Sequence, residues 1–199
     1  MLKTIMSNFG HPRGLVGQVV GWTMALENRE RIYWAISLLD VRPNDHVLEI
    51  GFGPGVGVER LAAQAKEGLV AGVDISDVMV RQASRRNAAA VKSGRVELQE
   101  GVAEKLSYDD QRFDKVLAIN SLHHWTDARA GLREVYRVLK PNGRVAIVEQ
   151  PPSKIRDEAE MKQRGNAIRD LLIESDFKDV ETIYATLERG MSVLVRGRR

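Results

Sequence analysis

A short apolar stretch that ends in a carboxylate and then turns on alternating glycines is the part of this sequence best suited to chemistry. Residues 47–57 read Val-Leu-Glu-Ile-Gly-Phe-Gly-Pro-Gly-Val-Gly, so that Glu49 precedes Gly51, Gly53 and Gly55. Glycine accepts a positive φ and has no Cβ to hold a ligand away from the backbone N–H groups. The pattern predicts a nucleotide-type cofactor lying against the main chain.

The glycine spacing narrows the choice of cofactor. A dinucleotide fingerprint needs G-x-G-x-x-G, but the sixth position is Val56 when counted from Gly51 and Val58 when counted from Gly53. A phosphate-binding P-loop closes on Gly-Lys-Ser/Thr, whereas residues 57–59 read Gly-Val-Glu and carry an acid instead of the lysine. Neither a dinucleotide nor ATP or GTP fits this spacing.

Five motifs in a fixed order carry a family resemblance. Glu49-x-Gly51-x-Gly53-x-Gly55, followed by Asp74-Ile75-Ser76-x-x-Met79, resembles the class I S-adenosylmethionine-dependent methyltransferases. Further motifs of that family stand at residues 101–106, 113–118 and 137–144, and the closest match is the small-molecule branch that includes the quinone-biosynthesis enzymes. The resemblance implies S-adenosyl-L-methionine as the cofactor and S-adenosyl-L-homocysteine as the product.

The resemblance also implies roles for residues that end or follow the first two strands. Asp74 would accept hydrogen bonds from the ribose hydroxyls, and such charge-assisted bonds are strong; an N-cap for the helix that opens at Ser76 is its alternative. Ile75 and Met79 would enclose the adenine, or else pack in the core. Glu49 would face the ammonium at the amino-acid end of the cofactor, or else lie at the surface.

The third and fourth motifs are less regular. Ala103 and Glu104 match the place where the family contacts the adenine edge, but Val102 stands where an acid is usual. Either Glu104 or backbone groups would then accept from the exocyclic amine. Asn120 follows the fourth strand and would pass beneath the reactive methyl. It opens no Asn-Pro-Pro-Tyr motif, so methylation of an amide or exocyclic amine by that mechanism loses support.

Histidines are the candidates for a general base, because imidazole titrates near neutrality and could take the proton of a hydroxyl nucleophile. His123 and His124 follow the fourth strand, and His11 lies in the preceding segment; each has a structural role as its alternative. Aromatic residues of the first segment would line an acceptor pocket or pack the cap on the sheet: Trp22, Tyr33 and Trp34. The acceptor is expected to be a small, partly apolar metabolite.

Two other functions stay open. Tyr136 and Lys140 have the spacing of the short-chain dehydrogenases, which suggests an NAD(P)-dependent Rossmann oxidoreductase. They fall at the end of a predicted helix, however, where Lys140 complements the helix dipole before the turn at residues 141–143. The irregular third motif leaves room for a non-catalytic S-adenosylmethionine-binding protein.

Composition suits one compact enzyme domain. The chain has 199 residues, 43% hydrophobic, with no cysteine and four histidines, so we expect no disulfide and no metal site. A net charge of +3, with basic clusters interspersed with acids, argues against nucleic acid as a partner. Apolar stretches near the start are shorter than the roughly 20 residues of a membrane span, and no leader is recognised, so a cytoplasmic location is expected.

Alternation of strand and helix patterns predicts an α/β fold, a Rossmann-like three-layer sandwich with a seven-stranded mostly parallel sheet and an N-terminal helical cap. The cap comprises residues 1–40, with helices at 13–26 and 28–39, and the cofactor-binding core residues 41–150. Its strands are expected at 45–50, 69–74, 95–100, 113–119 and 143–149. A helix at 155–175 and strands at 180–187 and 191–196 complete a single domain over residues 1–199; the resemblance makes those two strands antiparallel. Ligands in such sheets lie beyond the carboxyl ends of the strands, which brings five polar residues to one crevice: Glu49, Asp74, Glu104, Asn120 and Glu149.

Overall fold

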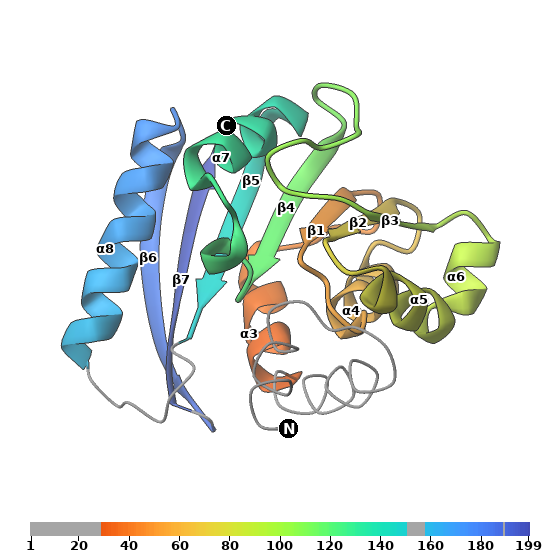
Figure 1. Ribbon diagram of the computed structural model, residues 1–199, viewed down its shortest axis with the longest axis horizontal. Coiled ribbons are helices and arrows are strands. Elements are labelled where there is room, and N and C mark those ends of the chain that lie inside the picture. Colours follow the sequence, from red (N-terminus) through yellow and green to blue (C-terminus); the bar gives the residue numbers. More distant parts are fainter. Residues whose placement is uncertain (1–28, 151–157, 189) are drawn as a thin grey trace.

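One seven-stranded sheet organises the molecule (Figure 1). The computed structural model describes residues 29–150, 158–188 and 190–199. The strand order is β3-β2-β1-β4-β5-β7-β6; β1 to β5 run parallel, and β7 runs antiparallel to both β5 and β6. The strands are β1 (His46–Ile50), β2 (Leu69–Asp74), β3 (Val96–Glu100), β4 (Phe113–Ile119), β5 (Leu139–Glu149), β6 (Lys178–Leu187) and β7 (Gly190–Arg198). The predicted mostly parallel sheet with an antiparallel final pair is confirmed.

Helices cover both faces of the sheet, which makes the predicted three layers (Figure 1). Helices α3, α4 and α5 pack on one face, and α7 and α8 pack on the other. The helices are α3 (Arg29–Leu39), α4 (Val56–Gln64), α5 (Asp77–Arg86), α6 (Ala88–Lys92), α7 (Ala128–Val138) and α8 (Glu158–Glu174), with a short 3₁₀ turn η1 (Leu122–His124) after β4.

Alternation along the central strands divides the core in two. In β4, Val116 and Ala118 belong to the cluster under α7 and α8, whereas Leu117 and Ile119 belong to the cluster under α3, α4 and α5. Successive side chains of a strand point to opposite faces, so a strand buried on both faces is apolar throughout. In β1 the same rule places Glu49 on the face of Val47, toward α4.

The first helix described is amphipathic as predicted, and its buried residues are Arg31, Ile32, Ala35, Ile36 and Leu39. The predicted helix at 13–26 lies outside the described residues, and the helical cap stays a prediction. In α8 two i,i+4 ion pairs form, Glu158 with Lys162 at 2.7 Å and Glu160 with Arg164 at 2.9 Å. Between 29 and 150 and from 158 onward, no helix has the length and apolar character to cross a bilayer.

The predicted start of the fifth strand is wrong. The strand begins at Leu139, four residues before the expected Gly143, and it includes the Pro141-Asn142 pair that was expected to form a turn. Asn142 does adopt a positive φ of 64°, and the pairing of β4 with β5 shifts register between Phe113 and Lys115. An irregularity within a continuous strand replaces the expected turn, and the preceding helix therefore ends at Val138.

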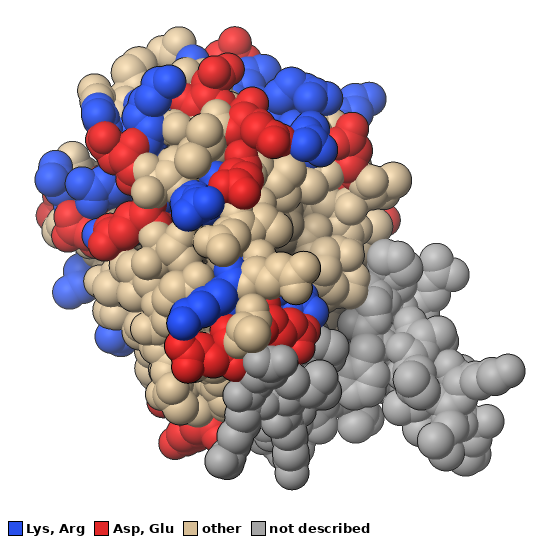
Figure 2. All heavy atoms as spheres, turned by 90° about the vertical axis from the view of Figure 1, so that its left-hand side faces the viewer, with Lys and Arg blue, Asp and Glu red and all other residues tan. Residues whose placement is uncertain are grey.

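Several basic residues of the surface are paired with acids. Arg81 contacts Asp77 at 2.6 Å, and near the C-terminus Arg196 contacts Glu181 at 2.6 Å. Figure 2 shows Lys and Arg side chains interspersed with Asp and Glu on the face that carries α8. Charges of both signs alternate there, and no broad patch of one sign extends over the visible face.

Candidate active site

A cleft opens at the carboxyl ends of β1, β2 and β4, and most of the residues selected from the sequence line it. It holds about 1080 Å³ of space, the open region at its mouth included. The candidates that line it are Glu49, Gly51, Gly53, Asp74, Ile75, Met79, Ala103, Glu104, Asn120 and His124. Gly55 and His123 lie beside it without lining it, and His11 lies outside the described residues. The predicted crevice therefore exists where the strand ends meet, but Glu149, which was also expected there, does not line it.

The turn between β1 and α4 brings backbone to the cleft. Gly51 has a φ of 74°, and a Cβ at this position would overlap the Cβ of Ser121, which follows β4. Gly53 has a φ of 53°, and a Cβ added at this position would meet no atom within 4 Å. Its main chain is therefore accessible from the cleft. Gly55, with a φ of 81°, is instead pressed against Ala83 of α5. Gly51 thus leaves room for the segment after β4, Gly53 exposes its backbone to the cleft, and Gly55 leaves room for α5.

Asp74 ends β2 with both carboxylate oxygens bonded to main chain. Its Oδ2 accepts from the N–H of Gly53 at 2.8 Å, and its Oδ1 accepts from the N–H of Ser76 at 2.9 Å. The N-cap of α5 is Ser76, whose hydroxyl accepts from the N–H of Met79. Asp74 is thus a fixed link between the glycine turn and the second strand, and the capping alternative falls to Ser76.

Glu49 is buried beside the cleft and lacks a complete set of partners. Only 3% of the residue is exposed, and within the described residues its Oε2 has no hydrogen-bond partner. A Cβ on Gly57 would overlap both of its carboxylate oxygens, so the first turn of α4 is pressed against them. Burial, and then the charge of Asp74, raise the pKa of Glu49 from 4.5 to about 8. The surface alternative for Glu49 is wrong.

Apolar side chains form the wall beyond β2 and β3. Ile75 and Val102 line the cleft while 45% and 40% exposed, which is unusual for large apolar residues. Met79 lines the cleft as well but is 2% exposed and belongs to the core under α5. Met79 therefore packs in the core and also borders the cleft, whereas Ile75 is available to a flat apolar ligand.

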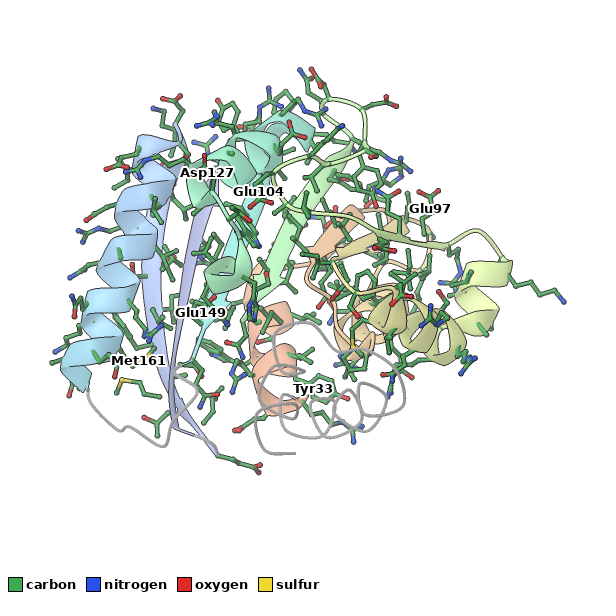
Figure 3. All side chains as sticks on the ribbon, viewed as in Figure 1. Tyr33, Glu97, Glu104, Asp127, Glu149 and Met161 are labelled. Carbon is green, nitrogen blue, oxygen red and sulfur yellow. The ribbon has the colours of Figure 1, made fainter. Side chains whose placement is uncertain are left out.

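Glu104 links the third motif to the start of α7. Its Oε1 accepts from the backbone N–H of Asp127 at 3.1 Å, and Asp127 in turn is the N-cap of α7 (Figure 3). Ala103 beside it is 4% exposed and packs in the core under α7 and α8. The loop that carries Glu104 is tied to the loop that carries the histidines.

Asn120 and Ser121 fix the chain that follows β4. Asn120 has a φ of 49°, its N–H donates to Val148 at 2.8 Å, and its Oδ1 accepts from the N–H of Gln150 at 3.0 Å. The hydroxyl of Ser121 donates to the carbonyl of Ile50 at 2.9 Å. This segment is bonded to β1 on one side and β5 on the other, and it forms part of the cleft floor.

The two adjacent histidines have different surroundings. His124 lines the cleft, whereas the Nδ1 of His123 lies 3.0 Å from Oε2 and 3.3 Å from Oε1 of Glu149. Glu149 ends β5 with 4% of the residue exposed, and Figure 3 shows it beside the turn that follows β4. The two imidazole rings touch, with centroids 4.0 Å apart. A carboxylate–histidine pair therefore stands next to the cleft.

Several lining residues escaped the sequence analysis. Phe52, Pro54 and Val56 fill the glycine turn, and Ile32 reaches the cleft from α3. On the other side are Ile119, Ser121, Trp125 and Thr126. The glycine motif itself signalled the first group, because its intervening residues must border the same turn. Ile32 belongs to the core under α3 and α4 as well.

The aromatic residues expected near an acceptor lie in different surroundings. Tyr33 lies outside the cleft lining with the guanidinium of Arg60 5.1 Å from its ring centroid. Trp34 packs against the core under α3 and α4. Trp22 lies outside the described residues. Packing therefore describes Trp34, whereas Tyr33 is exposed beside Arg29 and Arg60.

The dehydrogenase-like pair does not reach the cleft. Tyr136 packs edge-on against Phe177, with ring centroids 5.3 Å apart, and Lys140 pairs with Asp114 at 2.8 Å. Neither lines the cleft, so the oxidoreductase hypothesis has no support from this geometry. In the described part of the chain no group of three or more His, Asp or Glu side chains could hold a metal ion.

Comparison with known proteins agrees with the cleft and its motifs. Residues 47–143 match the profile of the family described as "Methyltransferase domain". Over 181 residues the chain is 29% identical to the uncharacterized methyltransferase YdaC of Bacillus subtilis, covering 91% of this chain and 98% of that protein. Over 117 residues it is 32% identical to the ubiquinone/menaquinone biosynthesis C-methyltransferase UbiE of Geotalea daltonii, covering 58% of this chain and 50% of that protein.

The fold has a counterpart among solved structures. A crystal structure of a SAM-dependent methyltransferase from Aquifex aeolicus superimposes with a TM-score of 0.66 at 18% identity, covering 88% of this chain and 91% of that one. The chain spans nearly all of YdaC but half the length of the UbiE relative. The ordered motifs, the sheet and these similarities together support a class I S-adenosylmethionine-dependent methyltransferase.

Proposed function

We propose that this protein transfers the methyl group of S-adenosylmethionine to a small, partly apolar metabolite by direct in-line displacement. The observation that carries the proposal is the shared cleft of the exposed Gly53 backbone, Asp74 and the Glu49 oxygen that has no partner among the described residues. A buried carboxylate oxygen without a partner is costly, so a cationic ligand group at this point supplies what the protein lacks.

The chemistry of these residues fits the proposed cofactor. Glu49 would hold the ammonium of its amino-acid end, and the carboxylate of Asp74 would accept from the ribose hydroxyls. Ile75 and Val102 offer apolar walls to the adenine. The sulfonium supplies an already activated methyl group, so the share of the protein is to align the acceptor and exclude water.

The acceptor side of the cleft supports a small apolar substrate. Ile32, Ile119 and Trp125 line it, and fixed polar groups stand beside them on the segment after β4. Pockets of this composition bind mostly apolar molecules and orient them through a few polar contacts. The C-methyltransferase named among the relatives acts in quinone biosynthesis, which is consistent with an acceptor of this kind.

Calorimetry with S-adenosylmethionine and S-adenosylhomocysteine tests the cofactor site. Wild-type protein is expected to bind in the micromolar range, and Asp74→Ala to bind at least about tenfold more weakly, a loss of about 1.4 kcal/mol. Asp77→Ala is the matched control, since Asp77 is exposed and pairs with Arg81 outside the cleft. Unchanged affinity in a folded Asp74→Ala variant would refute the site.

Methyl transfer itself is tested with a labelled donor. Wild-type protein, given S-adenosylmethionine with a tritiated methyl group and a metabolite extract, is expected to label an apolar small molecule. Binding of the donor without label in any acceptor would indicate a cofactor-binding protein that lacks transfer. A parallel titration with NADH is expected to show no binding at millimolar concentration.

A further inference from the structure

Two large apolar side chains are exposed at the cleft, on the connections that follow β2 and β3. Ile75 is 45% exposed and Val102 is 40% exposed, and both line the cleft. Exposed apolar side chains that meet in a concave site are the usual lining of a ligand pocket. This end of the cleft therefore offers apolar contact to a ligand while it stays open to water.

The sheet register brings these two side chains to adjacent strand ends. Strands β2 and β3 run parallel and pair up to Asp74 and Glu100, and the N–H of Gly101 donates to the carbonyl of Asp74 at 3.0 Å. Ile75 and Val102 follow directly after these strand ends. A nucleoside with its ribose bonded to Asp74 would therefore have its base at this apolar end of the cleft.

A tight turn fixes the backbone at Val102. The N–H of Lys105 donates to the carbonyl of Val102 at 3.3 Å, and the two residues form an isolated antiparallel bridge. The side chain of Val102 is β-branched, so it has few rotamers, and it carries neither a donor nor an acceptor. Residue 102 can therefore contact a ligand only through its methyl groups.

The acid of the same loop that lines the cleft is engaged elsewhere. Oε1 of Glu104 accepts from the backbone N–H of Asp127 at 3.1 Å, at the start of α7, and Figure 3 shows the two residues together beside that helix. If Glu104 turned toward a base beside Val102, this bond would be lost. The carboxylate of Glu104 is thus held to α7.

We infer that Val102 determines how the site selects its nucleoside: the base is bound through apolar contact and shape, and no side chain reads the amine at its 6-position. The inference rests on the proposed function and gives the selectivity of its cofactor site. An amine at the open end of the cleft keeps its hydrogen bonds to water, so it adds little to the affinity. The ligand class that fits is a purine nucleoside with a sulfonium or thioether side chain, with or without the amine.

Calorimetry with S-adenosylhomocysteine and its 6-deamino analogue measures this selectivity. The analogue has a hydrogen in place of the amine and keeps the ring nitrogens, the ribose and the amino-acid end, so a difference in Kd reports the amine alone. Wild-type protein is expected to bind the two ligands within about threefold of each other, because no bond to a protein side chain is lost.

Val102→Asp is expected to create a preference that the wild type lacks. A carboxylate at this position would accept from the amine, and hydrogen bonds to charged groups are strong, so the variant should bind S-adenosylhomocysteine about tenfold or more tightly than the analogue. Val102→Asn should give a smaller preference in the same direction without adding a charge. Ile173→Asp is the matched control, since Ile173 is exposed on α8 and does not line the cleft.

The two proposals fail in different ways. A wild type that prefers S-adenosylhomocysteine over the analogue by more than about threefold would overturn the inference and leave the proposed function standing. Folded Val102→Asp and Val102→Asn proteins that both bind the two ligands equally would also overturn the inference alone. A wild type that binds neither ligand would overturn the proposed function and the inference together.

Discussion

The two sides of the cleft are built in different ways. On the proposed cofactor side, the glycine turn, Glu49 and Asp74 are buried or bonded to main chain, and their partners follow from the β1–α4 and β2–α5 connections. Beside the proposed acceptor side, His123 is half exposed without lining the cleft, and its partner Glu149 comes from β5. The first side is a rigid holder set by backbone geometry. The second is a set of side chains that can differ between enzymes while the holder is retained.

The largest effect is expected from a methyl group at Gly51. Gly51→Ala places a Cβ into Ser121 at a positive φ, which combines overpacking with backbone strain and should cost about 3 kcal/mol or more of the free energy of unfolding. Gly53→Ala meets open space and carries only the φ penalty, about 1 kcal/mol. Denaturant unfolding of both variants measures the difference. Equal losses would show that the holder is not packed against the segment after β4.

A pH-dependent effect is expected at Glu49. Its pKa is raised to about 8 from 4.5, so the folded state binds a proton that the unfolded state has released between these values. The contribution of Glu49 is therefore present below about pH 4.5 and is lost as the pH rises through 8. Glu49→Gln removes the ionisable group, so its stability relative to wild type should rise by a few kcal/mol over this interval and then level off.

Thermal melts of both proteins from about pH 5 to pH 9 measure this effect. A constant difference in melting temperature over that range would show that Glu49 ionises freely. Calorimetry adds a direct check, because an ammonium group that pairs with Glu49 should displace its proton. Binding of S-adenosylmethionine near neutral pH is thus expected to release protons in wild type but fewer in Glu49→Gln.

The smallest effect is expected on the apolar wall of the cleft, where Ile75→Ala and Met79→Ala should separate cofactor binding from the free energy of unfolding. Ile75→Ala removes an exposed side chain and should weaken S-adenosylmethionine binding about threefold to tenfold, with the free energy of unfolding changed by about 0.5 kcal/mol or less. Met79→Ala opens the core and should cost about 2 kcal/mol or more of stability. Calorimetry paired with unfolding tests both. A stability loss in Ile75→Ala as large as in Met79→Ala would erase the distinction.

The sequence predicted the glycine turn and Asp74 better than the proposed acceptor side. The reason is the separation along the chain of the residues that must meet. Gly53 and Asp74 meet because a strand, a turn and a helix of ordinary length separate them, so spacing carries the information. Strands β1 to β4 fall within one residue of the expected bounds. Glu149 was expected at the crevice, but its contact with His123 depends on the register of β4 with β5 and on the conformation of η1.

Two other features could not be predicted from local sequence patterns. The early start of β5 depends on a register shift near Phe113 that lets a residue with positive φ, Asn142, remain within the strand. The need for glycine at position 51 comes from Ser121, seventy positions along the chain, so the motif indicated a turn but not its neighbour. Contacts between distant segments are visible only after the sheet is assembled.

A crystal structure with S-adenosylhomocysteine tests the central claim most directly. The account predicts the nucleoside between the Gly53 backbone and Ile75, its ribose hydroxyls within hydrogen-bond distance of Asp74, and its ammonium facing Glu49. Density for the nucleoside at another place, or a ribose that does not contact Asp74, would contradict it.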